Sequence, residues 1–160
     1  MSERIVDLDE QPTAAVRVQQ EMRELDIAGL FSHYLPVVFG RVAEHGGPSG
    51  PPYGRYFTFG PDQIDMEIGV PVTAPLPGLA PLDDCPPGEV GTSVLPAGPA
   101  GTTVHRGSYE GLGSAMLRLR AWILAEGRTP GAGQWESYVD DPARVLDPAD
   151  LTTELYWPLA

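Results

Sequence analysis

The segment from Gln134 to Pro142 alternates in side-chain type in a way that predicts a β-strand. Successive side chains of a strand point to opposite faces, so Glu136 and Tyr138 share one face and Trp135 lies on the other. A carboxylate that points into an apolar interior is costly unless it is paired, protonated or close to a cation. If this face is exposed to solvent instead, Glu136 is an ordinary surface residue, and the alternation alone leaves both interpretations open.

The first half of the chain predicts a strand, a helix and two further strands. Pro12 stands before the first strand, where the N–H that proline lacks is not needed. Apolar residues then recur at intervals of three and four residues, which indicates a helix. Pro36 lies inside this helix, which is therefore either kinked or restarted at Pro36. The predicted elements are a strand at 13–19, a helix at 27–42, and strands at 55–59 and 64–70 joined by a turn at 60–63.

A proline-rich stretch at 74–88 predicts an extended connector. The elements after the connector repeat the order of those before it. Ser108 is a candidate N-cap for the second helix, and Gly127 is well placed to end that helix. The predicted elements are strands at 89–95 and 102–106 with a turn at 96–101, a helix from 108 to 127, the strand that holds Glu136, and a strand at 151–157.

The two halves can be aligned as a sequence repeat. An offset of 82 residues places Tyr56 on Tyr138 and Gly54 on Glu136, so the carboxylate is present in one half only. Such an asymmetry would allow a site to orient its ligand. The matches are Ile64–Val72 with Leu151–Leu159 at an offset of 87, Ala43-Glu44 with Ala125-Glu126 at an offset of 82, and Thr13 and Arg17 with Thr102 and Arg106 at an offset of 89.

This pattern predicts an α+β fold of tandem duplicated β-α-β-β units, with pseudo-two-fold symmetry, an antiparallel sheet and two main helices. One such unit has too little apolar surface to be stable alone, so two units should share a core. The seam between the units would form a central cleft, where small ligands commonly bind. We expect a single domain over residues 1–160, with a first repeat at about 5–73, the connector at about 74–88 and a second repeat at about 89–160.

The charge of the chain narrows the classes of partner. Its 160 residues include 22 acidic and 10 basic ones, which gives a formal net charge of −12. A surface this negative repels phosphate backbones, so direct binding to nucleic acid is not expected. Cationic small molecules or basic protein surfaces are the partners that it would attract, although acidity can also serve solubility alone.

The sequence indicates no metal, cofactor or membrane segment. Cys85 is the only cysteine, and His33, His45 and His105 lack the spacing of metal ligands. No stretch approaches the roughly 20 apolar residues of a membrane helix, and the first residues lack a signal-peptide core. We therefore expect a cytoplasmic protein.

Six motifs follow one another along the chain: Pro51–Tyr56, Met66–Val72, Leu95–Gly98, Val104–Glu110, Trp135–Pro142 and Leu151–Leu159. No single motif is diagnostic, but in this order they resemble the GyrI-like small-molecule-binding domain. That domain also forms the effector-binding half of AraC-type and MerR-type transcription regulators. The resemblance covers nearly the whole chain and implies two β-α-β-β repeats with a ligand cleft between them.

The resemblance also implies a ligand class. Members of the family bind flat, hydrophobic, often cationic compounds between aromatic side chains, and a Glu supplies the counter-charge. Glu136 matches that Glu. Tyr109 and Tyr138 match the aromatic positions, Tyr56 is the match in the first half, and Trp135 would add a further aromatic face.

Catalysis is the alternative that the resemblance leaves open, because some free-standing relatives resemble hydrolases that open the cyclopropane ring of DNA-alkylating natural products. Such a reaction needs a base to take a proton from water, which would be Glu136. It also needs a donor on the leaving side, which would be the hydroxyl of Tyr56, Tyr109 or Tyr138. The sequence does not rank these three tyrosines.

Regulators of this kind carry a helix-turn-helix segment, and no basic helical segment of that type precedes Thr13 or follows Pro158. The chain is therefore expected to be a free-standing effector domain that does not bind an operator itself. The sequence does not show whether the chain acts together with a separate DNA-binding protein or with DNA gyrase. Glu67 and Glu154 match each other across the repeat and are interpreted as structural residues.

Overall fold

The computed structural model describes residues 3–21, 26–141 and 144–160. The chain divides into two compact units: unit 1 comprises Met1–Asp9 and Pro96–Ala160, and unit 2 comprises Glu10–Leu95. Each unit combines antiparallel strands with one main helix, which confirms the predicted α+β class. Within the described ranges, no helix is both long enough and apolar enough to cross a membrane.

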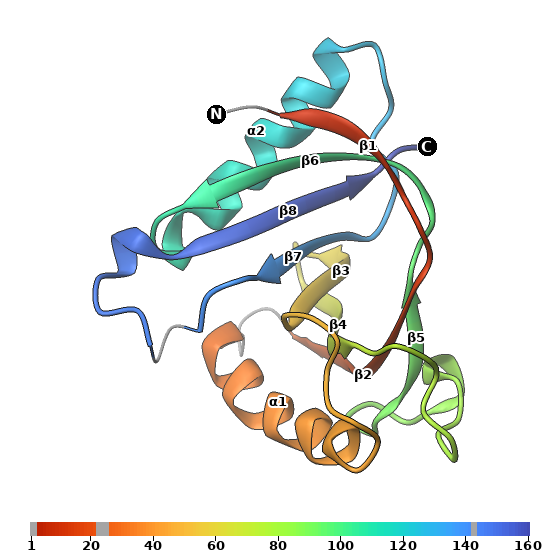
Figure 1. Cartoon of the computed structure of the whole chain (residues 1–160). Helices are drawn as coiled ribbons and strands as arrows, with labels where there is room; N and C mark the ends of the chain where they lie inside the picture. Colours follow the sequence, from red (N-terminus) through yellow and green to blue (C-terminus); the bar gives the residue numbers. More distant parts are fainter. Residues whose placement is uncertain (1–2, 22–25, 142–143) are drawn as a thin grey trace. The chain divides into compact units, whose positions relative to one another are not determined.

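Unit 2 contains β2 (Gln11–Glu21), α1 (Ile27–Ala43), β3 (Tyr53–Phe59), β4 (Gln63–Pro71) and β5 (Gly91–Leu95), with the strands in the order β3-β4-β2-β5. Helix α1 packs on β2 and β4 (Figure 1). Strands alternate their faces, so Val16 and Ile68 point to the same side and cluster with Val38 of α1. Pro36 lies inside α1, which continues through it as one helix.

Unit 1 contains β1 (Arg4–Leu8), β6 (Gly98–Arg106), α2 (Leu112–Ala125), β7 (Gln134–Tyr138) and β8 (Thr152–Pro158), with the strands in the order β1-β6-β8-β7. Helix α2 packs on β6 and β8 (Figure 1). Leu119 and Ile123 of α2 cluster with Leu155 of β8, and all three side chains are fully buried. This core lies on one face of the sheet only.

Each unit takes one edge strand from the other half of the chain. Only Asp9 and Glu10 separate β1 from β2, yet β1 pairs with β6 in unit 1. Only Pro96 and Ala97 separate β5 from β6, yet β5 pairs with β2 in unit 2. Neither half of the sequence therefore supplies all four strands of its unit.

The strand registers confirm the repeat at Glu136 and Tyr138. In unit 2, Gly54 lies opposite Ile68 and Tyr56 opposite Met66. In unit 1, Glu136 lies opposite Leu155 and Tyr138 opposite Thr153. Adding 82 to Gly54 and Tyr56, and 87 to their cross-strand neighbours on β4, gives the pairs of unit 1. Gly54 is thus the structural counterpart of Glu136.

The offset of 89 residues for the first strand of each repeat is wrong. Glu67 lies opposite Arg17, and its counterpart Glu154 lies opposite Val104. Arg17 therefore corresponds to Val104 at an offset of 87, and not to Arg106. A shift of two residues keeps every side chain on the same face, so alternation alone could not exclude it.

The turn predicted at 96–101 is also wrong, because β6 begins at Gly98. Glycine and proline in this segment suggested a turn, but β1 and β8 pair with it on both edges. Gly101 has a packing role: a Cβ at this position would lie 2.7 Å from Cδ1 of Ile123. Helix α2 approaches the sheet closely here, which explains a glycine inside a strand.

The second helix begins later than the sequence suggested. Ser108 makes no capping hydrogen bond through its side chain, and a 3-10 turn, η3 (Tyr109–Gly111), precedes α2. The far end agrees with the prediction, since Gly127 has a φ of +77° just beyond the C-cap. A residue with a side chain would be strained there.

A buried polar network holds the sheet of unit 2 together. Tyr53 donates a hydrogen bond to Glu67, Ser93 donates to the other carboxylate oxygen at 3.0 Å, and the hydroxyls of Thr13 and Tyr53 lie 2.9 Å apart. The four residues come from β3, β4, β5 and β2. Glu67 thus bonds to the exchanged strand β5, which agrees with its interpretation as structural.

Burial raises the pKa of Glu67 above its ordinary value of 4.5, although hydrogen bonds from Tyr53 and Ser93 act in the opposite direction. The folded protein therefore holds this proton more tightly than the unfolded chain does. The stability that follows is present below pH 4.5 and is lost as the pH rises through the raised pKa.

We expect the variant Glu67→Gln to lack this loss, because its side chain does not titrate. The free energy of unfolding of the wild type, relative to the variant, should fall with rising pH above 4.5, with a slope of at most about 1.4 kcal/mol per pH unit. Urea denaturation at a series of pH values measures it. Glu154→Gln, at the matching position of the repeat, is the control, and parallel profiles for all three proteins would contradict the prediction.

Candidate functional site

Glu136 is a buried carboxylate in β7 with 6% of its surface exposed. Its cross-strand neighbour is Leu155, which belongs to the apolar core beneath α2. Opposed residues of neighbouring strands share a face, so Glu136 points to the α2 side of the sheet. The surface interpretation of this residue is thereby excluded.

Tyr138 lies on the same face, as the alternation predicted. Its hydroxyl donates a hydrogen bond of 2.7 Å to Oε1 of Glu136, and its ring packs against the core of unit 1. Tyr109 meets it from η3, with the two ring centroids 5.5 Å apart in an edge-to-face arrangement. Glu136, Tyr138 and Tyr109 form one group, which we call the Glu136 cluster.

The hydroxyl of Tyr109 stays protonated at neutral pH. Burial raises its pKa, and the nearby carboxylates of Asp140 and Asp141 raise it further. About a third of this residue remains exposed. Tyr109 is therefore the member of the cluster that can offer an O–H to a molecule arriving from solvent.

His105 fixes the turn that presents Tyr109. Its Nε2 lies 2.9 Å from the carbonyl oxygen of Ser108, directly before η3. Gly107 has a φ of +136°, and a Cβ on Gly111 would lie 2.8 Å from the imidazole ring. Sequence reasoning missed this role of His105, and the two glycines that allow the chain to close around the ring were the available signal.

Thr153 is a second residue that the sequence did not single out. It is fully buried on β8, opposite Tyr138 on one side and His105 on the other. Within the described ranges, its Oγ1 is a buried side-chain atom with no hydrogen-bond partner. Such an atom costs stability unless water or a ligand satisfies it.

Two of the predicted ligand residues lie outside the Glu136 cluster. Trp135 is buried on the opposite face of the sheet, where its ring stacks on Tyr156 with centroids 5.2 Å apart. Tyr56 belongs to unit 2 and is part of the apolar core there. A role in ligand binding stays a prediction for both.

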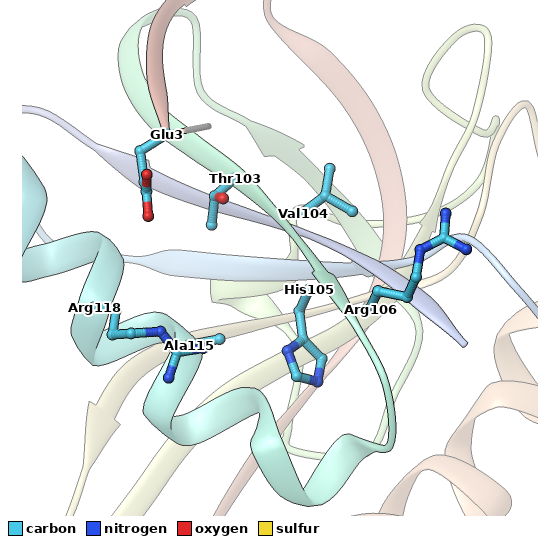
Figure 2. Close-up of a pocket in the computed structure, with 7 residues that line it drawn as sticks. All are labelled: Glu3, Thr103, Val104, His105, Arg106, Ala115 and Arg118. Atoms are coloured by element: carbon cyan, nitrogen blue, oxygen red, sulfur yellow. The ribbon is translucent and has the colours of Figure 1, made fainter. Parts of the chain in front are cut away.

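A hollow of about 430 Å³ opens elsewhere on unit 1, between β6 and α2 (Figure 2). No member of the Glu136 cluster lines it. In the close-up, the imidazole of His105 and the side chain of Arg118 lie on the α2 side of β6, whereas Val104 and Arg106 project away from α2. The lining residues are Glu3, Thr103, Val104, His105, Arg106, Ala115 and Arg118.

The described part of the chain contains no group of three or more His, Cys, Asp or Glu side chains that could hold a metal ion. Asp and Glu are frequent in the sequence, but the two buried glutamates lie in separate units, and each accepts a hydrogen bond from a tyrosine. The chemistry that the Glu136 cluster offers is that of a carboxylate with phenol groups.

Solved structures with the same fold include the C-terminal domain of EcmrR, with a TM-score of 0.76 and 20% sequence identity, covering 99% of this chain and 97% of that one. In a complex of EcmrR with DNA, this chain spans 57% of the EcmrR chain. SAV2435, solved bound to tetraphenylphosphonium, has a TM-score of 0.69 at 14% identity and is covered over 94% of its length by all of this chain.

A hydrolase from Listeria innocua also has this fold, with a TM-score of 0.63 and 13% identity, over 99% of this chain and 91% of that one. No curated protein matches the sequence. The GyrI-like small molecule binding domain matches residues 1–160. Together with the two β-α-β-β repeats, this match shows that the chain belongs to the GyrI-like small molecule binding domain family.

Proposed function

We propose that this protein captures hydrophobic, aromatic, cationic compounds and that Glu136 supplies the counter-charge. The observation that carries the proposal is a buried carboxylate grouped with two tyrosine rings. The family binds small molecules, and the chemistry of the Glu136 cluster selects cations among them.

The physical reason lies in the surroundings of Glu136. Removing a carboxylate from water is expensive, and an opposite charge placed next to it offsets that cost. An aromatic ring adds about 0.5 to 2 kcal/mol of cation–π attraction for each well-placed face. A delocalised cation is favoured because it loses little hydration energy on entry, whereas a compact ammonium loses much more.

The comparison with SAV2435 supports this ligand class, since that protein was solved with tetraphenylphosphonium, an aromatic cation. The formal net charge of −12 also favours the approach of cations. Trp135 and Tyr56 remain proposed contributors to the aromatic surface. Tyr56 occupies the position in the first repeat that Tyr138 occupies in the second.

We expect Glu136→Gln to fold normally and to bind tetraphenylphosphonium at least about tenfold more weakly, which corresponds to 1.4 kcal/mol. The variant keeps the shape of the side chain and removes its charge. Quenching of tryptophan fluorescence in a titration measures the affinity. Glu154→Gln removes a carboxylate from the adjacent strand β8, on the face away from Glu136, and should leave the affinity unchanged.

Triphenylphosphine oxide, which is aromatic but neutral, provides the second control. Its affinity should be nearly the same for wild type and Glu136→Gln, because no charge pair is lost. Equal binding of tetraphenylphosphonium by wild type and Glu136→Gln would refute the role of Glu136 as counter-charge.

A hydrolase acting on cyclopropane-bearing alkylators is the second candidate function. The pairing of a carboxylate with phenol groups favours it, and a hydrolase shares the fold. Glu136 would take a proton from water as the water oxygen bonds to a ring carbon and the strained C–C bond breaks. The electron pair of that bond would pass to a conjugated acceptor group of the substrate, and a tyrosine hydroxyl would then protonate this group. Tyr109 is proposed as this donor, because Tyr138 already donates to Glu136.

If this reaction occurs, the protein should convert an excess of a cyclopropane-bearing alkylator into its water adduct, with many turnovers per molecule. Mass spectrometry of the product measures it. Tyr109→Phe should lower kcat by about 10²-fold or more, since general acid catalysis of this kind contributes 10²–10⁴-fold. Loss of one equivalent of compound without turnover would indicate capture alone and reject the enzyme.

A further inference from the structure

The outer face of α2 exposes an apolar stripe. Leu117 is 67% exposed and Leu124 is 47% exposed. These positions are seven residues apart and fall on one side of the helix, with Ala121 between them. A stripe of this kind costs free energy when it faces water, and it points to a contact with another surface.

Two arginines flank this stripe. On the helical wheel, Arg120 lies on one side of it and Arg118 on the other, and both are exposed. Within the described ranges, neither guanidinium contacts a carboxylate. No acidic residue occurs from Leu112 to Ala125, although the whole chain has a net charge of −12. The outer face of α2 is thus apolar and positive on an acidic protein.

The hollow between β6 and α2 has a mixed charge, because Glu3 and Arg118 both line it. Arg118 reaches the hollow from α2, whereas the side chain of Arg106 projects from β6 away from α2 and does not add to the positive face (Figure 2). The surface that suits a partner with both acidic and apolar side chains is therefore the outer face of α2.

The same unit displays a segment with the complementary character. Leu146 is fully exposed, and it lies in the loop at 144–150 that leads into β8. Asp147 and Asp150 follow it and are exposed as well. Arg144 precedes them and pairs with Asp141 at 3.7 Å, so we call 146–150 the acidic loop. Two α2 helices from different copies would not pair directly, because their arginines would meet without any acid between them.

We propose that a second copy of this chain docks here, with the acidic loop of each copy on the α2 face of the other. Leu146 would cover the stripe of Leu117 and Leu124, while Asp147 and Asp150 would approach Arg118 and Arg120. Both contacts would form twice around a two-fold axis, so the α2 face and the acidic loop of each copy would both be covered. This pairing is independent of the Glu136 cluster.

Charge reversal tests the pairing directly. Arg118→Glu/Arg120→Glu makes both surfaces acidic, and Asp147→Arg/Asp150→Arg makes both basic. Each variant alone should be monomeric, but a mixture of the two should restore dimers, because each reversed face then meets an opposite partner. Sedimentation equilibrium over a wide range of protein concentration measures this, and circular dichroism checks the fold of each variant.

Apolar contacts have their own matched controls. Leu124→Ser should raise the dimer dissociation constant by about tenfold or more, as expected for a residue near the centre of an interface. Val37→Ser, at a position of similar exposure on α1, should not change it. A wild type that stays monomeric, dimers that ignore the α2 substitutions, or a mixture that does not re-associate would overturn the proposal.

Discussion

Backbone hydrogen bonding of two exchanged edge strands is the constraint on which the architecture depends. β1 and β5 are each only two residues away from a strand with which they could form a hairpin, yet both pair in the other unit. Two-residue hairpin turns require positive φ, which glycine and asparagine supply. Asp9–Glu10 and Pro96–Ala97 are poorly suited to this, and Pro96 is locked near a φ of −65°. The linkers therefore disfavour a hairpin, and the chain continues into the other unit.

The sequence was sufficient for most of the elements because their signals are local. Alternation located β7 and placed Glu136 with Tyr138, and the spacing of apolar residues located both helices. β1 has too few residues for a clear alternation, and it went unrecognised. The glycines at the start of β6 are typical of a turn, and only the pairing of β6 with β1 and β8 shows that they belong to a strand.

Non-local groups could not be predicted in the same way. Thr13, Tyr53, Glu67 and Ser93 come from four different strands, and only the sheet order brings the hairpin that holds Tyr53 and Glu67 next to the other two strands. The alignment of β2 with β6 across the repeat was open to an error of two residues, because alternation does not detect such a shift. Tyr109 was found through family resemblance, whereas its support by His105 depends on a tight bend that no periodicity reports.

Two buried glutamates of one chain thus have different surroundings. Glu67 receives hydrogen bonds from β3 and β5 and serves the sheet. Glu136 receives one from Tyr138, whose ring meets the partly exposed Tyr109 before α2. Burial alone does not distinguish them. The distinction comes from position, since Glu67 has a counterpart in the other repeat and Glu136 has Gly54 in its place.

The crossed edge strands also bear on how such a chain could have arisen. A single repeat produced as its own polypeptide would have a leading strand whose linker disfavours folding back, and a sheet lacking its outermost member. Two such polypeptides would complete one another by trading strands. Joining two copies of the gene end to end would place this strand exchange within one polypeptide. The two repeats could then diverge, and one of them could acquire a glutamate that the other lacks.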